Sequence, residues 1–186
     1  MKLFLASLVL ATSALTATAH AADWKVDAAQ SSLRFSGVSQ GEAFDGTFAR
    51  FTPLIRFDPA ALAGSRFDVS IDLASADTQN EERDSTLATG DFFDVEKFPQ
   101  AKFVAEEFAA TADGGFEARG TLSLRGVSKP VTLSFTWTAV DGGARLEGKA
   151  KLDRIAFGVG AGDDWSDPDS IAHDVGVATT LVLRAP

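Results

Sequence analysis

Cysteine is absent from the 186 residues of the chain, and only two histidines are present. Without cysteine the protein can form no disulfide, no thiolate nucleophile and no zinc–thiolate site. Basic residues are scarce as well, since 17 Lys and Arg stand against 26 Asp and Glu and give a formal net charge of −9. An acidic protein repels the phosphate backbone of nucleic acids, so we expect no nucleic-acid partner.

Long apolar runs are missing too, except near the first residues. Met1 and Lys2 precede a mainly apolar stretch over 3–15, and Ala19-His20-Ala21 has the small-residue pattern of a signal-peptidase site. This stretch is shorter than the ~20 residues that a membrane-spanning helix requires. The sequence therefore predicts a cleaved signal peptide over 1–21, export to the periplasm, and one domain over 22–186, which is long enough to bury a core without disulfides.

Alternation of apolar and polar residues runs through nearly all of the remaining chain. It predicts about eight strands joined by short turns such as Asp113-Gly114-Gly115 and Asp141-Gly142-Gly143. The apolar parity changes between Phe48 and Phe51 and again near Asp153, which predicts a β-bulge or bend at each place. Eight antiparallel strands that close on themselves form a barrel whose interior is filled by side chains or holds one slender ligand.

Small residues interrupt the inward-facing rows of this pattern. They are Gly37, Gly46, Gly120, Gly148 and Ala150. Small inward residues either leave space for a ligand or mark bends and places where strands approach closely. The pattern alone favours neither interpretation.

One segment breaks the alternation, the charged and Phe-rich stretch NEERDSTLATGDFFDVEKFPQAKF over 80–103. Its first part, 81–89, predicts a short helix across one end of the barrel. Leu87, Phe92, Phe93 and Phe98 are predicted to face the interior, with Arg83, Asp84, Asp91 and Asp94 at the rim. Arg83 and Asp84 have two interpretations, since they can anchor a polar headgroup or cap the helix and hold it in place by hydrogen bonds, which is the commoner role.

The chain resembles the YceI family of periplasmic polyisoprenoid-binding proteins in this stretch and along most of its length. The matching motifs are WKVD (24–27), SLRF (32–35), GTF (46–48), IRFDP (55–59), N-x-x-RD-x-x-L-x-x-x-DFFD-x-x-x-FP (80–99), GTLSLRGVSKPV (120–131) and RIAFG (154–158). The resemblance implies an all-β fold, an extended eight-stranded antiparallel lipocalin-like β-barrel. It also implies an apolar tunnel that holds a long isoprenoid, such as a polyprenyl lipid or a quinone tail, and a homodimer. Gln30 and Ser85 depart from the pattern, because many members have histidine beside these motifs, so no role of those histidines is transferred.

Strands of about nine residues would enclose a tunnel about 30 Å long. The residues expected to line it are apolar and lie on the inward rows or in the Phe-rich segment, although any barrel core shows such rows. They are Phe35, Phe48, Phe57, Val69, Ile71, Leu87, Phe92, Phe93, Phe98, Leu122, Leu124, Leu133, Phe135, Trp137 and Leu146. Arg83 and Asp84 remain the candidates for the rim or for headgroup contact.

A second acidic stretch, 160–174, contains His173, the only histidine outside the predicted signal peptide. The spacing of Asp163, Asp164, Asp167 and Asp169 lacks the order of a calcium loop, so we expect a solvated loop and no metal site. No nucleophile motif such as G-x-S-x-G accompanies the histidine, which argues against a hydrolase.

We therefore expect a non-enzymatic protein without cofactors, whose ligand is an isoprenoid lipid or quinone held for transport or storage. The alternative is an interaction or accessory module for an inner-membrane cytochrome b-type or quinone-dependent electron-transfer partner, with the barrel as a scaffold. The long acidic loop resembles a subgroup with such partners. An enzyme acting on the quinone head ranks last, because no base, cofactor motif or metal cluster is visible in the sequence.

Overall fold

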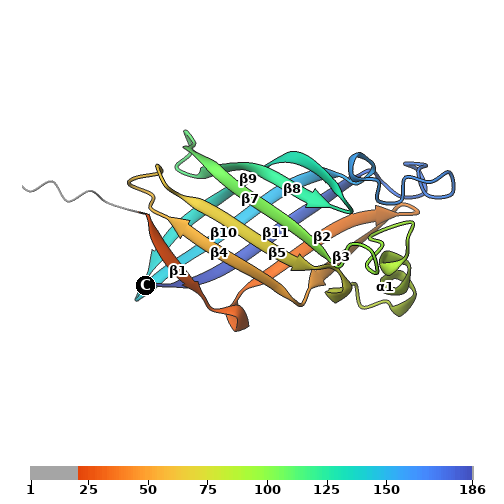
Figure 1. Cartoon of the computed structure of the whole chain (residues 1–186), viewed down its shortest axis with the longest axis horizontal. Helices are drawn as coiled ribbons and strands as arrows, with labels where there is room; N and C mark the ends of the chain where they lie inside the picture. The colour runs from red at the N-terminus through yellow and green to blue at the C-terminus, as the bar shows by residue number, and fades with distance from the viewer. Residues whose placement is uncertain (1–20, 186) are drawn as a thin grey trace, which may run out of the picture.

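The computed structural model describes residues 21–185, most of which lie in β-strands. In chain order the elements are β1 (Ala22–Val26), η1 (Ala28–Gln30), β2 (Ser32–Ser39), β3 (Glu42–Phe48), β4 (Phe51–Phe57), β5 (Arg66–Asp72), η2 (Leu73–Ser75), β6 (Ala76–Asp77), α1 (Glu81–Ala88), β7 (Gln100–Ala110), β8 (Phe116–Leu124), β9 (Val127–Val140), β10 (Gly143–Asp153), η3 (Ile155–Phe157) and β11 (Asp174–Arg184), where η denotes a short 3₁₀ helix (Figure 1). The predicted signal peptide over 1–21 lies outside the described residues, apart from Ala21.

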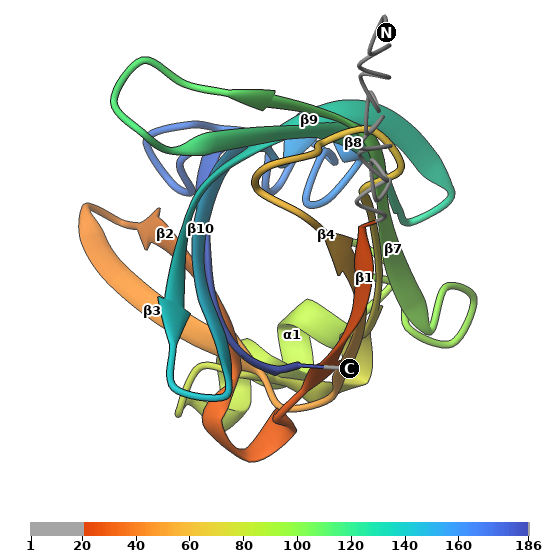
Figure 2. The same ribbon diagram turned by 90° about the vertical axis from the view of Figure 1, so that its left-hand side faces the viewer.

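The strands form one antiparallel meander that closes into a barrel. β1, β4, β5, β7, β8, β9, β10 and β11 are paired in this order, and β1 completes the ring by pairing with β11. β2, β3 and β6 continue β1, β4 and β5 beyond short interruptions, so the wall consists of eight long strands. Figure 2 looks into this ring from one end, with α1 across the far opening. The predicted eight-stranded antiparallel barrel with a short helical insert is confirmed.

The predicted bend between Phe48 and Phe51 is present, since β3 ends at Phe48 and β4 begins at Phe51. The bulge predicted near Asp153 is wrong, because β10 ends there and a 3₁₀ turn follows. The parity changes at this position because the strand ends. A register shift that the pattern did not reveal lies in β7, between Ala105 and Glu107.

Two apolar clusters occupy different halves of the barrel. The first surrounds Phe57, whose ring centroid lies 4.8–6.0 Å from the centroids of five other rings; these belong to Phe67, Phe108, Phe116, Phe135 and Trp137. The second cluster gathers at the end covered by α1 and includes Leu87, Phe92 and Phe93. No helix among residues 21–185 is long and apolar enough to cross a membrane.

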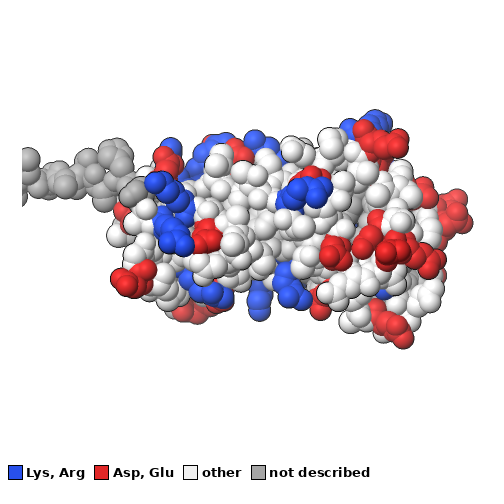
Figure 3. All heavy atoms as spheres, turned by 90° about the horizontal axis from the view of Figure 1, so that it is seen from below, with Lys and Arg blue, Asp and Glu red and all other residues white. Residues whose placement is uncertain are grey.

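Charge is distributed unevenly along the barrel. The segments 76–99 and 158–174, at the α1 end, contain twelve acidic residues and only two basic ones, Arg83 and Lys97. The other described residues contain fourteen acidic and fourteen basic side chains, so the net charge lies at the α1 end. Figure 3 shows the acidic atoms crowded at this end on the face that it displays.

Candidate functional site, an apolar cavity

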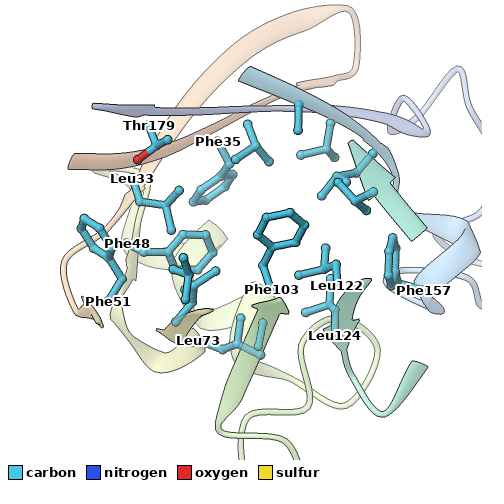
Figure 4. A pocket seen from close by; sticks show the side chains of 18 of the residues that line it. Leu33, Phe35, Phe48, Phe51, Leu73, Phe103, Leu122, Leu124, Phe157 and Thr179 are labelled. Carbon is cyan, nitrogen blue, oxygen red and sulfur yellow. The ribbon is translucent and has the colours of Figure 1, made fainter. Parts of the chain in front are cut away.

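A cavity lies inside the barrel between α1 and the middle of the strands. The cavity has a volume of ≈ 210 Å³, which is room for about seven water-sized groups at roughly 30 Å³ each. Side chains from β2 to β5, from α1 and from β7 to β11 form its wall. Phe103 projects into the middle of the view in Figure 4, with Phe35, Phe48, Leu122 and Leu124 around it.

Most residues predicted to line a tunnel lie on the wall of this cavity. These are Phe35, Phe48, Val69, Ile71, Leu87, Phe92, Phe93, Leu122, Leu124, Leu133 and Leu146. Their contact with a ligand stays a prediction, but their placement follows from the alternation along each strand. The sequence reasoning missed Phe103, although it ends the Phe-rich stretch over 80–103 and lines the cavity.

Four of the predicted lining residues lie elsewhere. Phe57, Phe135 and Trp137 belong to the aromatic cluster, where they contact one another, so they form the floor below the cavity. Phe98 packs against the β8–β9 turn, where a Cβ on Gly126 would lie 2.9 Å from its ring. The expectation of a tunnel about 30 Å long is corrected, because aromatic side chains fill one half of the barrel.

The inward glycines make room for neighbouring side chains. A Cβ on Gly46 would lie 2.3 Å from the Phe35 ring, and one on Gly37 would lie 2.9 Å from the Phe44 ring. At Gly120 the backbone of β7 approaches, with Val104 O 2.3 Å from the position of a Cβ. Close packing therefore explains these glycines, although Gly37, like Ala150, also lines the cavity.

The first part of the cap over the cavity is α1 with the turn that follows it. Asn80 begins the helix by accepting a hydrogen bond from the Arg83 backbone N–H, at 2.9 Å. Asp84 Oδ1 accepts hydrogen bonds from the N–H and the hydroxyl of Thr78, at 2.9 and 2.7 Å. The Arg83 guanidinium lies 4.5 Å from the centroid of the Phe44 ring, within cation–π range. These contacts place both Arg83 and Asp84 in the structure of the cap.

The second part of the cap is the acidic loop over 158–173, which Arg154 organises. The Arg154 guanidinium donates hydrogen bonds of 2.6–3.0 Å to five backbone carbonyls; they belong to Val159, Gly160, Trp165, Ile171 and Ala172. The residue is 5% exposed. Burial lowers the pKa of Arg154, and the neighbouring Asp153 carboxylate opposes this effect. All five N–H donors of the side chain are thus used within the protein.

Arg154 is a structural residue that the sequence reasoning did not single out. A signal was present, because Arg154 continues the inward row of Leu146, Gly148, Ala150 and Leu152. A charged side chain at an inward position requires partners that replace its hydration. In this protein the partners are the loop carbonyls.

Further contacts join the two parts of the cap. Arg125, in the β8–β9 turn, donates hydrogen bonds to the carbonyls of Gly90 and Gly158. The Trp165 ring packs edge-on against Phe92, with centroids 5.3 Å apart, and its N–H lies 3.3 Å from an Asp91 oxygen. Within the part of the chain that the structure describes, no three His, Asp or Glu side chains are placed to hold a metal ion.

The fold and the site together define an eight-stranded β-barrel protein with an internal apolar cavity between an aromatic cluster and a cap. The YceI-like domain model matches residues 24–183, and the chain belongs to the YceI family. A UPF0312 protein of Shewanella denitrificans is 38% identical over 135 residues, which cover 71% of each chain. A UPF0312 protein of Pseudomonas savastanoi is 33% identical over 169 residues, 86% of this chain and 88% of the relative.

Solved structures show the same barrel. The crystal structure of Burkholderia cenocepacia BcnA has a TM-score of 0.81 at 29% identity and covers 85% of this chain and 99% of its own. A polyisoprenoid binding domain from Saccharophagus degradans, implicated in plant cell wall breakdown, has a TM-score of 0.65 at 18% identity, over 90% of this chain and all of its own. At that identity the second likeness shows the fold alone.

Proposed function

We propose that the protein is an exported, non-enzymatic binding protein that holds the apolar chain of an isoprenoid lipid or quinone in the periplasm, for transport or storage. The observation that carries this proposal is the cavity. Its polar lining side chains are Ser36, Thr179 and Arg154, and the donors of Arg154 are all engaged. Such a site suits an apolar chain and offers no acid, base or nucleophile. Membership of the YceI family, for which the resemblance implies an isoprenoid ligand, supports the ligand class.

The size of the cavity limits how much of the ligand it encloses. Room for about seven water-sized groups corresponds to one or two isoprene units of about five carbons each, because a methylene group and a water molecule occupy similar volumes. The aromatic floor prevents deeper penetration. A longer chain would therefore leave its remaining units outside the cavity.

The competing environment in the cell is a membrane. Measured from water, burial of about seven carbons contributes about 6 kcal/mol, which corresponds to a Kd on the order of 10⁻⁵–10⁻⁴ M. Measured from a bilayer, the chain exchanges one apolar environment for another, and the net preference is small. A small preference is what a carrier requires, because it must both load and release its lipid.

Extraction of the purified protein tests this proposal. The protein is purified from a bacterial host without detergent, extracted with organic solvent and analysed by mass spectrometry. We expect an isoprenoid lipid at a substantial fraction of the protein concentration. The matched control is the variant Val131→Phe/Ala150→Phe, which fills the cavity. Absence of isoprenoid from the wild-type extract, or equal amounts in both proteins, would refute the proposal.

A second candidate function has one supporting observation, the acidic cap. Its net charge of −10 over 76–99 and 158–174 would steer a basic partner toward this end of the barrel. This fits an accessory module that docks on a membrane cytochrome b-type or quinone-dependent electron-transfer protein. Docking of this kind weakens with added salt and persists in the cavity-filled variant. Lipid binding, in contrast, does not weaken with added salt and is lost in that variant. The homodimer implied by the resemblance also stays a prediction, which analytical ultracentrifugation would check.

A further inference from the structure

The barrel wall contains a seam between the strand formed by β1 and β2 and the strand formed by β3 and β4. β1 pairs with β4 and β2 pairs with β3, but residues 25–33 and 48–54 have no partners across this seam. The interruption has a local cause on each side. η1 turns the first strand, and the parity change between Phe48 and Phe51 bends the second. The two backbones therefore separate in the middle of the wall.

A polar groove lies outside the seam and meets the cavity there. The groove has a volume of ≈ 640 Å³ and is bordered by η1, by the bend between Phe48 and Phe51 and by the outer faces of β4 and β5. Leu33, Phe48 and Phe51 line both the groove and the cavity. Figure 4 shows these three side chains together at one side of the cavity, beside Thr179. At the seam, apolar side chains rather than backbone separate the two spaces.

The two ends of the barrel offer no comparable route to the cavity. The aromatic cluster around Phe57, itself 1% exposed, fills the end opposite α1. At the α1 end, Arg154 and Arg125 hold the loop over 158–173 and the turn after α1 by hydrogen bonds to backbone carbonyls. Opening the cap would break these bonds, whereas no backbone pairing crosses the seam, where the side chains of Leu33, Phe48 and Phe51 lie between the groove and the cavity.

The groove presents neutral hydrogen-bonding groups. Thr52 and Ser70 are direct cross-strand partners on the outer face, and Gln100 stands opposite Asp72 on the next strand. Within residues 21–185 the side chains of Thr52, Ser70 and Gln100 make no hydrogen bond to the protein. The charged residues of the groove are Arg50 and Asp72, which pair with each other at 2.8 Å.

This composition selects among headgroups. A diphosphate carries several negative charges and is held by unpaired cations. The groove has a single cation, which a carboxylate already neutralises. A quinone ring or an alcohol needs only hydrogen-bond donors and acceptors, and these are available beside the seam.

We propose that the isoprenoid chain passes through the seam between Phe48 and Phe51, and that a neutral headgroup, a quinone or an alcohol, stays in the polar groove beside Thr52, Ser70 and Gln100. This inference rests on the proposed function, because it concerns the same ligand. It adds the class of headgroup and the route by which the chain enters. It also explains why the outer face of the barrel is polar beside the seam, where the apolar lining of the cavity meets the groove.

Affinity measurements with three C20 probes test the headgroup. The probes are geranylgeraniol, geranylgeranyl diphosphate and the corresponding hydrocarbon, each titrated against displacement of a fluorescent apolar dye. We expect the alcohol to bind best. The variant Thr52→Val/Ser70→Val should weaken the alcohol about tenfold, as expected for the loss of one or two hydrogen bonds, and leave the hydrocarbon unchanged. The matched control is Thr132→Val/Ser134→Val on the exposed outer face of β9.

The outcomes separate the two proposals. Binding of no probe would overturn the proposed function and this inference together. Preference for the diphosphate, or equal loss of alcohol and hydrocarbon in the groove variant, would overturn the headgroup assignment and leave the cavity function standing.

Transfer kinetics test the route. Ala28 and Ala49 are exposed on the two sides of the seam, and Ala28→Trp/Ala49→Trp places indole rings across it. We expect uptake of geranylgeraniol from phosphatidylcholine vesicles to slow by about tenfold or more, since each transfer must displace these rings. Ala63→Trp, in the exposed β4–β5 loop, is the control. An unchanged rate in the seam variant would show that the chain enters elsewhere.

Discussion

Filling the cavity should prevent ligand binding while the protein still folds. The variant Val131→Phe/Ala150→Phe fills it with side chains from two strands. Val131 on β9 and Ala150 on β10 are half-buried and line the cavity, so larger side chains there extend into empty space. The two substitutions add about ten carbons to a space for about seven such groups. The cavity is thereby filled.

The expected effects on stability and binding differ in size. Burial of the added carbons contributes favourably, and strain from imperfect fit costs about 1–3 kcal/mol, so the free energy of unfolding changes by less than about 3 kcal/mol in either direction. The ligand loses contacts worth about 6 kcal/mol at 0.8 kcal/mol per methylene, which corresponds to a change of about 10⁴-fold in Kd.

Two assays measure these quantities. Circular dichroism during urea unfolding gives the stability, and displacement of a fluorescent dye by geranylgeraniol gives the affinity. Thr136→Phe is the matched control, because it adds the same ring on the exposed outer face of β9. A cavity-filled variant that folds like the wild type and binds within threefold of it would refute the assignment of the cavity as the ligand site.

Three further predictions concern what holds the site together. Arg154→Lys should destabilise the protein by about 3 kcal/mol, because several loop carbonyls lose their hydrogen-bond donor. Urea unfolding measures this change, with the exposed Arg145→Lys as the control. A loss of less than about 1 kcal/mol would contradict the role of Arg154 in the cap. Gly46→Ala should cost about 1–3 kcal/mol, because its Cβ would lie 2.3 Å from the Phe35 ring, whereas Gly162→Ala, with nothing within 4 Å, should be neutral. Hydrogen bonds from Arg184 and Gln30 lower the pKa of Asp27, so its contribution is complete above the unfolded pKa of about 3.9 and is lost as the pH falls through the lower folded pKa. The stability difference between wild type and Asp27→Asn should be constant from about pH 5 to 7 and shrink as the pH falls below about 3.9. A difference that grows with acidification would contradict this.

Alternation along the strands was sufficient to predict the barrel and most of its inward residues. Each strand has two faces, so a row such as Leu122 and Leu124 needs no tertiary information to be assigned to the interior. The bend after Phe48 was equally visible, because a change of parity requires an extra residue. Likewise, the capping residue Asn80 and the acids after it marked the start of α1.

The division of the interior into a floor and a cavity was not visible in the sequence. Phe57 and Phe48 have the same residue type and both face inward, yet one is enclosed by five aromatic rings and the other faces open space. The difference depends on which residues of neighbouring strands lie at the same height, and this is set by register and strand tilt. A pattern read along one strand contains neither quantity.

The seam and the cap could not be predicted from the sequence for the same reason. Arg154 could be recognised as unusual for an inward position, but its five acceptors come from a loop without a repeating pattern. The separation of β1/β2 from β3/β4 depends on two interruptions, near residues 28 and 49, that face each other only in the folded barrel. Long-range pairing thus decides where the cavity meets solvent.

The most direct measurement is a crystal structure of the protein grown with a quinone that carries a geranylgeranyl tail. We predict continuous density for the tail from the seam at Phe48 and Phe51, past Phe103, to the aromatic floor at Phe67, with the ring in the groove beside Thr52. An empty cavity in a crystal of the saturated protein, or a ligand bound only on the outer surface, would contradict the central claim that this barrel holds an isoprenoid chain.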